Sequence, residues 1–162
     1  MSHADEIAHD DPLAADVRNL IDTHLAFNNS VTPPEEVYAV DALGLVHPDI
    51  EFFSFRRDGE LLAVGALKRL DEHHAELKSI HTTAAARGQG IGARMIGHLI
   101  GEARRQGFRR VSLETGTMPE FEPARRMYTR AGFVPCEPFG QYRRTPYSAC
   151  LTMVFDDGVR RW

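Results

Sequence analysis

The stretch RGQGIGARMIGHLIGEARRQG, residues 87–107, joins a glycine-rich loop to a long amphipathic helix. Apolar residues recur at positions 91, 95, 99 and 103, which is helical spacing, and Gly107 is a helix-ending glycine. Glycines let a ligand approach the backbone closely, and the unpaired amides of a helix N-terminus lie at the positive end of the helix dipole. We therefore expect the loop to bind an anion, with a phosphate as the natural occupant.

Two nucleotide-binding loops can be compared with this glycine pattern. Gly88, Gly90 and Ala93 formally match the dinucleotide fingerprint, but that fingerprint follows its strand almost directly and precedes several βαβ units. Here residues 82–86 intervene, and only about 70 residues follow the loop. A P-loop is excluded because no Lys-Ser or Lys-Thr pair follows the glycines. A glycine turn that serves only packing remains the alternative to a phosphate site.

Hydrophobic periodicity predicts the elements around the loop. Helices are expected at 12–26, 33–43 and 121–131, and strands at 50–56, 60–70, 75–82, 110–115, 133–137 and 148–155. Asp58-Gly59 is a hairpin signal, so the first three strands should form an antiparallel meander. Residues 1–11 are expected to be flexible, with a short edge strand at 4–9 as the alternative. The order predicts a single α/β domain over residues 1–162, with a mixed central sheet that combines the meander with one βαβ unit and is flanked by helices.

Local signals set the ends and faces of these elements. Asp11-Pro12 is typical of a helix start, and the polar residues 28–30 are expected to end that helix. Residues 32–35 have capping-box spacing and should begin the second helix. Strict alternation along the strand 75–82 places Leu77, Ser79 and His81 on one face and Glu76, Lys78 and Ile80 on the other.

Composition and charge exclude several classes of protein. With 43% hydrophobic and 26% charged residues, the chain is typical of soluble globular proteins. No apolar run approaches the ~18 residues of a membrane helix, and residues 1–11 lack the apolar core of a secretory signal. A net charge of −4 disfavours nucleic acid as a partner. Cys136 and Cys150 are too few for a disulfide framework, so we expect a cytoplasmic protein.

Two motifs in order resemble a known family. R-x-x-G-x-G at 87–92, between a strand and a helix, resembles the pyrophosphate motif of the GNAT N-acyltransferases. A-x-x-x-Y-x-x-x-G-F at 124–133 resembles the family's second motif, one strand and one helix further on. The chain is also similar to a bacterial branch with E-L-K-S before the loop, here 76–79, and L-E-T-G after the loop helix, here 113–116, for which no substrate is settled. The resemblance covers about residues 50–155.

This resemblance implies an N-acetyltransferase. Such an enzyme moves the acetyl group of acetyl-CoA, its co-substrate, to a primary amine of a small molecule or peptide, by direct attack while both substrates are bound. The backbone of Ile80, His81 and Thr82 would pair with the pantetheine arm like an added strand. The pyrophosphate would lie on the loop residues Arg87, Gly88, Gln89, Gly90, Ile91, Gly92 and Ala93.

The resemblance also suggests catalytic residues. Tyr128 matches the helix tyrosine that protonates the departing thiolate, and a phenol with a pKa near ~10 can donate at neutral pH. A core aromatic residue is the alternative. Glu114 lies where some members carry a general base, and Glu76 on the neighbouring strand is the competitor. A carboxylate on an apolar strand is unfavourable unless it is paired or functional, so a structural salt bridge, for Glu76 to Lys78 or an arginine, is the alternative for each.

Features on the acceptor side are less specific. Many relatives carry an asparagine where this chain has Phe121. The acceptor is expected between residues 28–36 and 139–148, where Arg143 and Arg144 either pair with a substrate carboxylate or form a solvated basic turn.

Other functions and partners remain open. A non-catalytic acyl-CoA-binding sensor or regulatory module is the first alternative, and a nucleotide-binding protein of another fold is the second. No metal site is expected, because His73 and His74 form the only histidine cluster and adjacent residues on a strand point in opposite directions. The sequence does not identify the amine or the acyl length, and a homodimer is possible in this family context.

Overall fold

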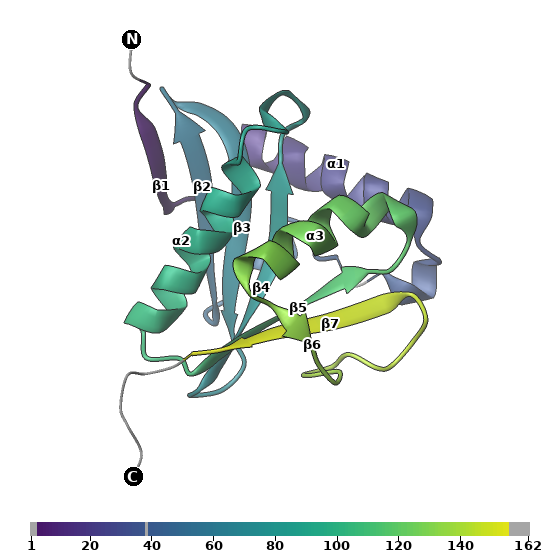
Figure 1. Ribbon diagram of the computed structural model, residues 1–162. Coiled ribbons are helices and arrows are strands. Elements are labelled where there is room, and N and C mark those ends of the chain that lie inside the picture. The colour runs from purple at the N-terminus through teal and green to yellow at the C-terminus, as the bar shows by residue number, and fades with distance from the viewer. Residues whose placement is uncertain (1–2, 38, 156–162) are drawn as a thin grey trace.

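In the computed structural model, which describes residues 3–37 and 39–155, seven strands form one mixed sheet in the order β1-β2-β3-β4-β5-β7-β6 (Figure 1). The strands are β1 Asp5–His9, β2 Ile50–Arg57, β3 Glu60–Arg69, β4 His74–Thr82, β5 Arg110–Gly116, β6 Val134–Pro135 and β7 Ser148–Val154. The helices are α1 Ala15–Val31, α2 Ile91–Arg105 and α3 Glu122–Ala131. Short 3-10 turns lie at η1 Pro34–Glu36, η2 Leu43–Leu45, η3 Ala84–Ala86 and η4 Pro119–Phe121.

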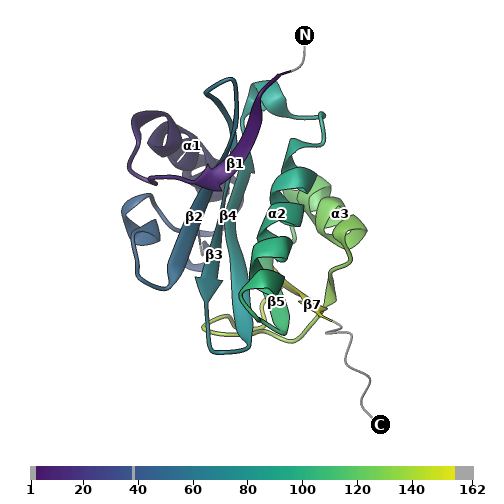
Figure 2. The same ribbon diagram turned by 90° about the vertical axis from the view of Figure 1, so that its left-hand side faces the viewer.

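Helices cover both faces of the sheet. Helix α1 lies on one face, and α2 and α3 lie on the other (Figure 2). Strand β2 serves both layers, because Phe53 and Phe55 pack in the core under α2 while Phe52 packs in the core under α1. Strands β2, β3 and β4 are antiparallel, and β4 pairs parallel with β5. The predicted α/β domain with a meander and one βαβ unit is therefore confirmed. None of the described helices is both long and apolar enough to cross a membrane.

The hairpin between β2 and β3 turns at the predicted dipeptide. Asp58 and Gly59 have φ angles of 51° and 84°. Two successive residues with positive φ form the two-residue turn whose twist matches that of the flanking strands. Helices α2 and α3 are each followed by a glycine with positive φ. Gly107 and Gly132, with φ angles of 87° and 110°, follow α2 and α3 as the sequence predicts.

Strand β4 contains a bulge at Ser79. Ala66 of β3 pairs with Lys78, but Val64 pairs with His81, so β4 carries one extra residue, and Ser79 has a φ angle of 55°. The predicted alternation is consequently wrong beyond this point. Ile80 packs against the same core that contains Leu77, whereas the His81 ring lies 4.4 Å from the His24 ring of α1.

The sheet splits between β4 and β5. Their parallel pairing covers only three residue pairs, from His74 with Arg110 to Glu76 with Ser112. Beyond Glu76 the two strands diverge, and β5 continues with β7 away from β4 (Figure 1). The remaining part of β4 therefore has a backbone edge on the β5 side along which none of the described strands lies.

Helix α1 differs from its predicted range. It begins at Ala15, after a turn in which the Asp11 side chain accepts a hydrogen bond from the Leu13 amide at 2.9 Å. It also continues through residues 28–30, which were expected to end it. Asn28 donates its side-chain amide to the His24 carbonyl at 3.0 Å, and Ser30 donates its hydroxyl to the Phe27 carbonyl at 2.7 Å. These side chains bond back into the helix instead of terminating it.

The predicted second helix, 33–43, is wrong. The segment forms η1 and η2 with extended backbone at Val37, and the capping box is absent because Thr32 is the residue that ends α1. Among the described residues of this region only Ala42 is buried against the α1 core, with Leu45 just beyond it, so these residues offer no apolar stripe of helical length to stabilise a helix. Residue 38 lies outside the described part of the chain. The expected strand 133–137 is also shortened, to β6.

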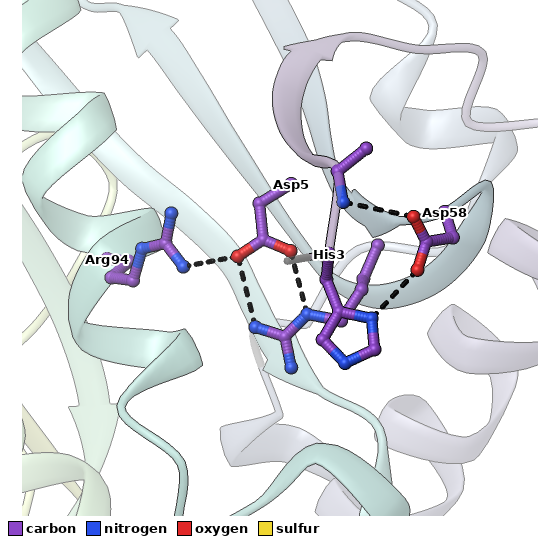
Figure 3. A network of polar contacts seen from close by, with 6 residues as sticks. His3, Asp5, Asp58 and Arg94 are labelled. Carbon is purple, nitrogen blue, oxygen red and sulfur yellow. Dashed lines mark hydrogen bonds and ion pairs between the residues drawn. The ribbon is translucent and has the colours of Figure 1, made fainter. Parts of the chain in front are cut away.

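The N-terminal segment is an edge strand. Because β1 pairs antiparallel with β2, the expected flexibility of residues 1–11 is wrong over β1, and the alternative of a strand at 4–9 is confirmed. Asp5 ties this strand to the molecule. Its carboxylate accepts hydrogen bonds from Arg57 of β2 at 2.7 Å and from Arg94 of α2 at 2.8 Å (Figure 3). The first two residues of the chain are not described.

Candidate active site

A cavity of about 110 Å³ lies where β4 and β5 diverge. Its walls come from α1, from residues 76–80 of β4 and residues 114–116 of β5, from α3 with the turn η4 before it, and from the segments that follow α1 and precede β7. The structure thus brings together the three residues for which the sequence predicts catalytic roles, namely Glu76, Glu114 and Tyr128.

Glu76 is paired inside the protein. Its residue is 3% exposed, and its Oε2 accepts hydrogen bonds from the Lys78 ammonium at 3.2 Å and from the Tyr142 hydroxyl. Lys78 also lies over the Tyr142 ring, 5.7 Å from its centroid. The alternative raised by the sequence, a structural ion pair with Lys78, is therefore present for Glu76. The Oε2 of Glu76 is thus already occupied by an ammonium and a phenol, and a substrate amine would have to displace one of them to bind there.

Glu114 has a different environment. Its Oε2 accepts one hydrogen bond, from the Ser148 hydroxyl at 2.7 Å, and no ion pair links it to a cation within the described residues. Burial raises the pKa of Glu114 to about 7, an effect that the Ser148 hydrogen bond and Lys78 oppose and that the charges of Glu76 and Glu36 increase. A carboxylate with a pKa near 7 is suited to accept a proton at neutral pH.

Tyr128 is a buried phenol on the same cavity. Its residue is 8% exposed, and burial, followed by the charge of Glu114, raises its pKa to about 12. Within the described part of the chain, no hydrogen bond to its hydroxyl is present. The ring packs edge-on against Phe133, with centroids 6.2 Å apart. This phenol stays protonated at neutral pH and has a proton to donate.

The glycine loop has the geometry of an anion site. Gly88 and Gly90 both have a φ of 76°, and no heavy atom lies within 4 Å of the position that a Cβ would take at either. The first bond of α2 runs from the Arg94 amide to the Gly90 carbonyl at 3.1 Å. The three preceding amides, at residues 91–93, therefore have no acceptor in the helix and remain available for a phosphate. Arg87 is exposed at the edge of this loop.

The other predicted loop residues have supporting positions. Gln89 donates its side-chain amide to the Ala85 carbonyl at 3.2 Å, which closes the loop on η3. A Cβ at Gly92 would lie 2.8 Å from the Met127 sulfur, so the missing side chain allows α2 to approach α3. Ile91 is buried in the core, and Ala93 is exposed beside the free amides.

The strand segment predicted to pair with the pantetheine arm borders the same region. His81 and Thr82 pair with Val64 and Ala63 of β3. On its other side the segment has no strand partner among the described residues, because the pairing with β5 ends at Glu76. An extended ligand that enters between β4 and β5, such as the expected pantetheine arm, could therefore form hydrogen bonds with the backbone of this edge. Burial, followed by the charges of His24 and Arg87, lowers the pKa of His81 to about 3, so its imidazole is neutral.

Phe121 fills the position at which the sequence lacks an asparagine. The residue is 8% exposed and lines the cavity. A Cβ at Gly116 would lie 2.3 Å from the Phe121 ring, so the end of β5 has to be a glycine for this ring to fit. The pair shapes the wall next to Glu114, where no polar contact from that position is available.

Several predicted features lie elsewhere or carried no signal. Arg143 and Arg144 are exposed and do not line the cavity, and Arg144 pairs with Glu137, which matches the alternative of a solvated basic turn. Conversely, the sequence pattern assigns no individual role to Ser148 or Tyr142. Both fall within residues 139–148, the segment expected to border the acceptor.

The Acetyltransferase (GNAT) family profile matches residues 17–133 of this chain. The chain belongs to the GNAT acetyltransferase family. Its GNAT relatives include a Bacillus subtilis protein named uncharacterized N-acetyltransferase YsnE, 41% identical over 143 residues, which cover 88% of this chain and 95% of the relative. Uncharacterized N-acetyltransferase YedL of Escherichia coli is 35% identical, over 91% and 92% of the two chains. A protein named IAA acetyltransferase from Azospirillum brasilense is 33% identical, over 88% and 92%.

Solved GNAT structures share the fold. A Klebsiella pneumoniae protein described as an acyl-CoA N-acyltransferase superposes with a TM-score of 0.75 at 23% identity, over 93% of this chain and 97% of that one. A GNAT family acetyltransferase from Elizabethkingia anophelis, solved with acetyl-CoA bound, gives a TM-score of 0.61 at 17% identity, over 93% and 98%. As a GNAT member, this protein is an acetyl-CoA-dependent acyltransferase, and acetyl-CoA is its co-substrate.

Proposed function

We propose that this GNAT protein transfers an acetyl group from acetyl-CoA to the primary amine of a small molecule or peptide, within a ternary complex. The observation that supports this proposal most strongly is that Glu114 and Tyr128 line one cavity, at the split between β4 and β5. The cavity thus combines a carboxylate whose pKa suits a base with a phenol that keeps its proton.

Each residue has a defined task in the proposed reaction. Glu114 takes a proton from the incoming ammonium, directly or through one water, so that the neutral nitrogen can attack the acetyl carbonyl. The new C–N bond forms as the C–S bond breaks, and Tyr128 donates its proton to the departing sulfur. The nitrogen of the new C–N bond then gives up its second proton to the Tyr128 phenolate, directly or through water, and Glu114 releases its proton to solvent, so that both residues return to their starting states. Glu76 holds Lys78 and Tyr142 in place through its hydrogen bonds and leaves the base role to Glu114.

Positioning of acetyl-CoA is assigned to the backbone. The thioester co-substrate supplies the acetyl group, and the chain supplies two binding surfaces for it. The amides of the loop from Arg87 to Ala93 would take the pyrophosphate, and the free edge at Ile80, His81 and Thr82 would hold the pantetheine arm. Holding the reacting groups together in this way supplies much of the rate gain of a two-substrate enzyme.

A non-catalytic acyl-CoA sensor is the second candidate function. It would need the loop but not an acid and base, and the presence of both Glu114 and Tyr128 on one cavity argues for turnover. Cys136 and Cys150 are both free thiols, which agrees with the proposed cytoplasmic location.

A thiol-release panel tests the proposal. Acetyl-CoA is incubated with pooled amines, amino acids, peptide N-termini and IAA, the compound in the name of one relative. The expected result is acceptor-dependent release of free CoA together with an acetylated amine identified by mass spectrometry. Binding of acetyl-CoA without release from any pool would instead support the sensor.

A further inference from the structure

Glu36 is a carboxylate on the cavity wall with no task in the proposed reaction. It ends η1, the turn that follows α1, and it lines the cavity together with Glu114. Its Oε2 is buried and accepts no hydrogen bond from the described residues. Buried acceptors in native structures normally have partners, because loss of solvation without a replacement is unfavourable. The side chain is therefore suited to receive a donor from a bound molecule.

The charges on the cavity wall indicate that this donor is a cationic group. The one ammonium on the cavity wall, that of Lys78, lies 3.2 Å from the Glu76 carboxylate, so the two charges compensate each other. Burial lowers the pKa of His24 to about 4, so this wall residue is neutral near pH 7 and does not repel a cation. Glu36 and Glu114 are then the two carboxylates without a cationic partner among the described residues.

The two carboxylates lie within electrostatic reach of each other. Glu36 is among the groups whose charge acts on Glu114, after burial, the Ser148 hydrogen bond, Lys78 and Glu76. The cavity that both residues line measures about 110 Å³, well below the roughly 300–1,000 Å³ of pockets that take drug-sized ligands. A short molecule with a donor at each end can therefore contact both carboxylates.

We infer that Glu36 selects acceptors that carry a second cationic group, so that the substrate class is small diamines and related dications. The reactive amine lies at Glu114, and the second ammonium or guanidinium donates to the Oε2 of Glu36. An anionic acceptor would instead face two carboxylates. This inference rests on the proposed function, because it deepens the specificity of the same site.

Two acceptors of equal chain length provide the test. Diaminobutane carries an amine at both ends of a four-carbon chain, and butylamine carries one. The measurement is kcat/KM for CoA release with each acceptor, in the wild type and in Glu36→Gln. Since a hydrogen bond to a charged group contributes roughly 10- to 100-fold in affinity, we expect the wild type to prefer diaminobutane by about that factor. Glu36→Gln should bring the two acceptors to within a few-fold of each other.

Glu35→Gln is the matched control. Glu35 belongs to the same turn, is exposed and does not line the cavity, so its neutralisation should leave the preference for diaminobutane in place. Calorimetric titration of diaminobutane into the CoA-loaded proteins provides a second readout. Binding should weaken about 10- to 100-fold in Glu36→Gln and stay unchanged in Glu35→Gln.

The outcomes separate this inference from the proposed function. It is overturned if the wild type uses butylamine as well as diaminobutane, if Glu36→Gln keeps the preference, or if diaminobutane fails to bind. In each of these cases, acetyl transfer to some other amine would leave the proposed function intact. Absence of transfer to every amine would remove the proposed function itself, and with it the specificity built on it.

Discussion

Tyr128 and Glu114 line one cavity from α3 and β5, and the charge of Glu114 adds to burial in raising the pKa of Tyr128 to about 12. The raised pKa values of Tyr128 and Glu114 have complementary consequences. A phenol with a raised pKa keeps its proton at neutral pH, so Tyr128 enters the proposed reaction in the protonated form. A carboxylate with a pKa of about 7 is ionised in a large fraction of molecules at neutral pH and still binds a proton well.

Tyr128→Phe should remove the proposed general acid while preserving the packing of the ring against Phe133. We expect kcat to fall about 10²- to 10⁴-fold, as is usual when a general acid is lost, with the Kd for acetyl-CoA nearly unchanged. Stopped-time CoA release and calorimetry measure the two quantities. Turnover within a few-fold of the wild type would show that the thiolate takes its proton from another source.

Gly90→Glu should abolish binding of acetyl-CoA. The residue has a φ of 76°, and the new side chain would place a negative charge at the N-terminus of α2, where the pyrophosphate is proposed to lie. Gly101→Glu is the matched control, because Gly101 is exposed on the same helix and no heavy atom would lie within 4 Å of its Cβ. Calorimetry should detect normal binding in Gly101→Glu. Equal binding in both variants, with the fold intact by circular dichroism, would make the loop structural.

Neutralising the two glutamates should change stability in opposite directions. Glu114 has a raised pKa, so the folded state holds its proton while the unfolded state loses it between pH 4.5 and about 7, and stability falls as pH rises through that window. Glu114→Gln should therefore stabilise the protein at pH 8, by up to about 2–3 kcal/mol, and by much less at pH 4. Urea unfolding at the two pH values measures this difference.

Glu76→Gln should destabilise the protein at pH 8. The substitution breaks the buried ion pair with Lys78 and leaves an ammonium without its counter-charge, which costs on the order of 2–3 kcal/mol. Because both variants replace a glutamate by glutamine, the difference between their free energies of unfolding reports the different surroundings of the two side chains. If Glu114→Gln were also destabilising at pH 8, the unpaired state of Glu114 would be contradicted.

Asp5→Asn should lower Tm by loosening β1. Hydrogen bonds from Arg57 and then Arg94 hold the pKa of Asp5 well below its ordinary value of 3.8 (Figure 3). A lowered pKa stabilises the fold above the unfolded-state value, and that stabilisation disappears as the pH falls below it. The Tm difference from the wild type should therefore shrink below pH ~4 and in high salt. Asp22→Asn, at an exposed position of α1, should show neither effect.

The elements with strong local signals could be predicted from the sequence. The Asp58-Gly59 turn, the periodic apolar stripe of α2 and the closing glycines Gly107 and Gly132 depend on backbone chemistry within a few residues, and the structure has each of them. The bulge at Ser79 has no such signal. It depends on how β4 meets β3, and an alternating pattern cannot show where one extra residue is inserted.

The candidate site, like the fold, could be predicted only in part from the sequence. The motifs led to Glu76, Glu114 and Tyr128 as candidates, and the three line one cavity. The proposed choice of Glu114 over Glu76 as the base required the side-chain contacts of the structure. One of the two groups that donate hydrogen bonds to the Glu76 carboxylate is the hydroxyl of Tyr142, which lies 66 residues away in sequence. Glu36 lies at the end of residues 28–36, a segment expected to border the acceptor, but the sequence assigned it no individual role, since its position depends on a segment whose predicted helix does not form.

The pH dependence of acetyl transfer tests the central claim, that Glu114 serves the amine in this cavity. The profile of kcat/KM is measured for the wild type, Glu114→Gln and Glu76→Gln, with two acceptors of different amine pKa so that the limb due to the acceptor can be recognised. The wild type should lose activity below an apparent pKa of about 7 that is the same for both acceptors. That limb should vanish in Glu114→Gln and persist in Glu76→Gln. A limb that persists in Glu114→Gln and vanishes in Glu76→Gln would contradict the account.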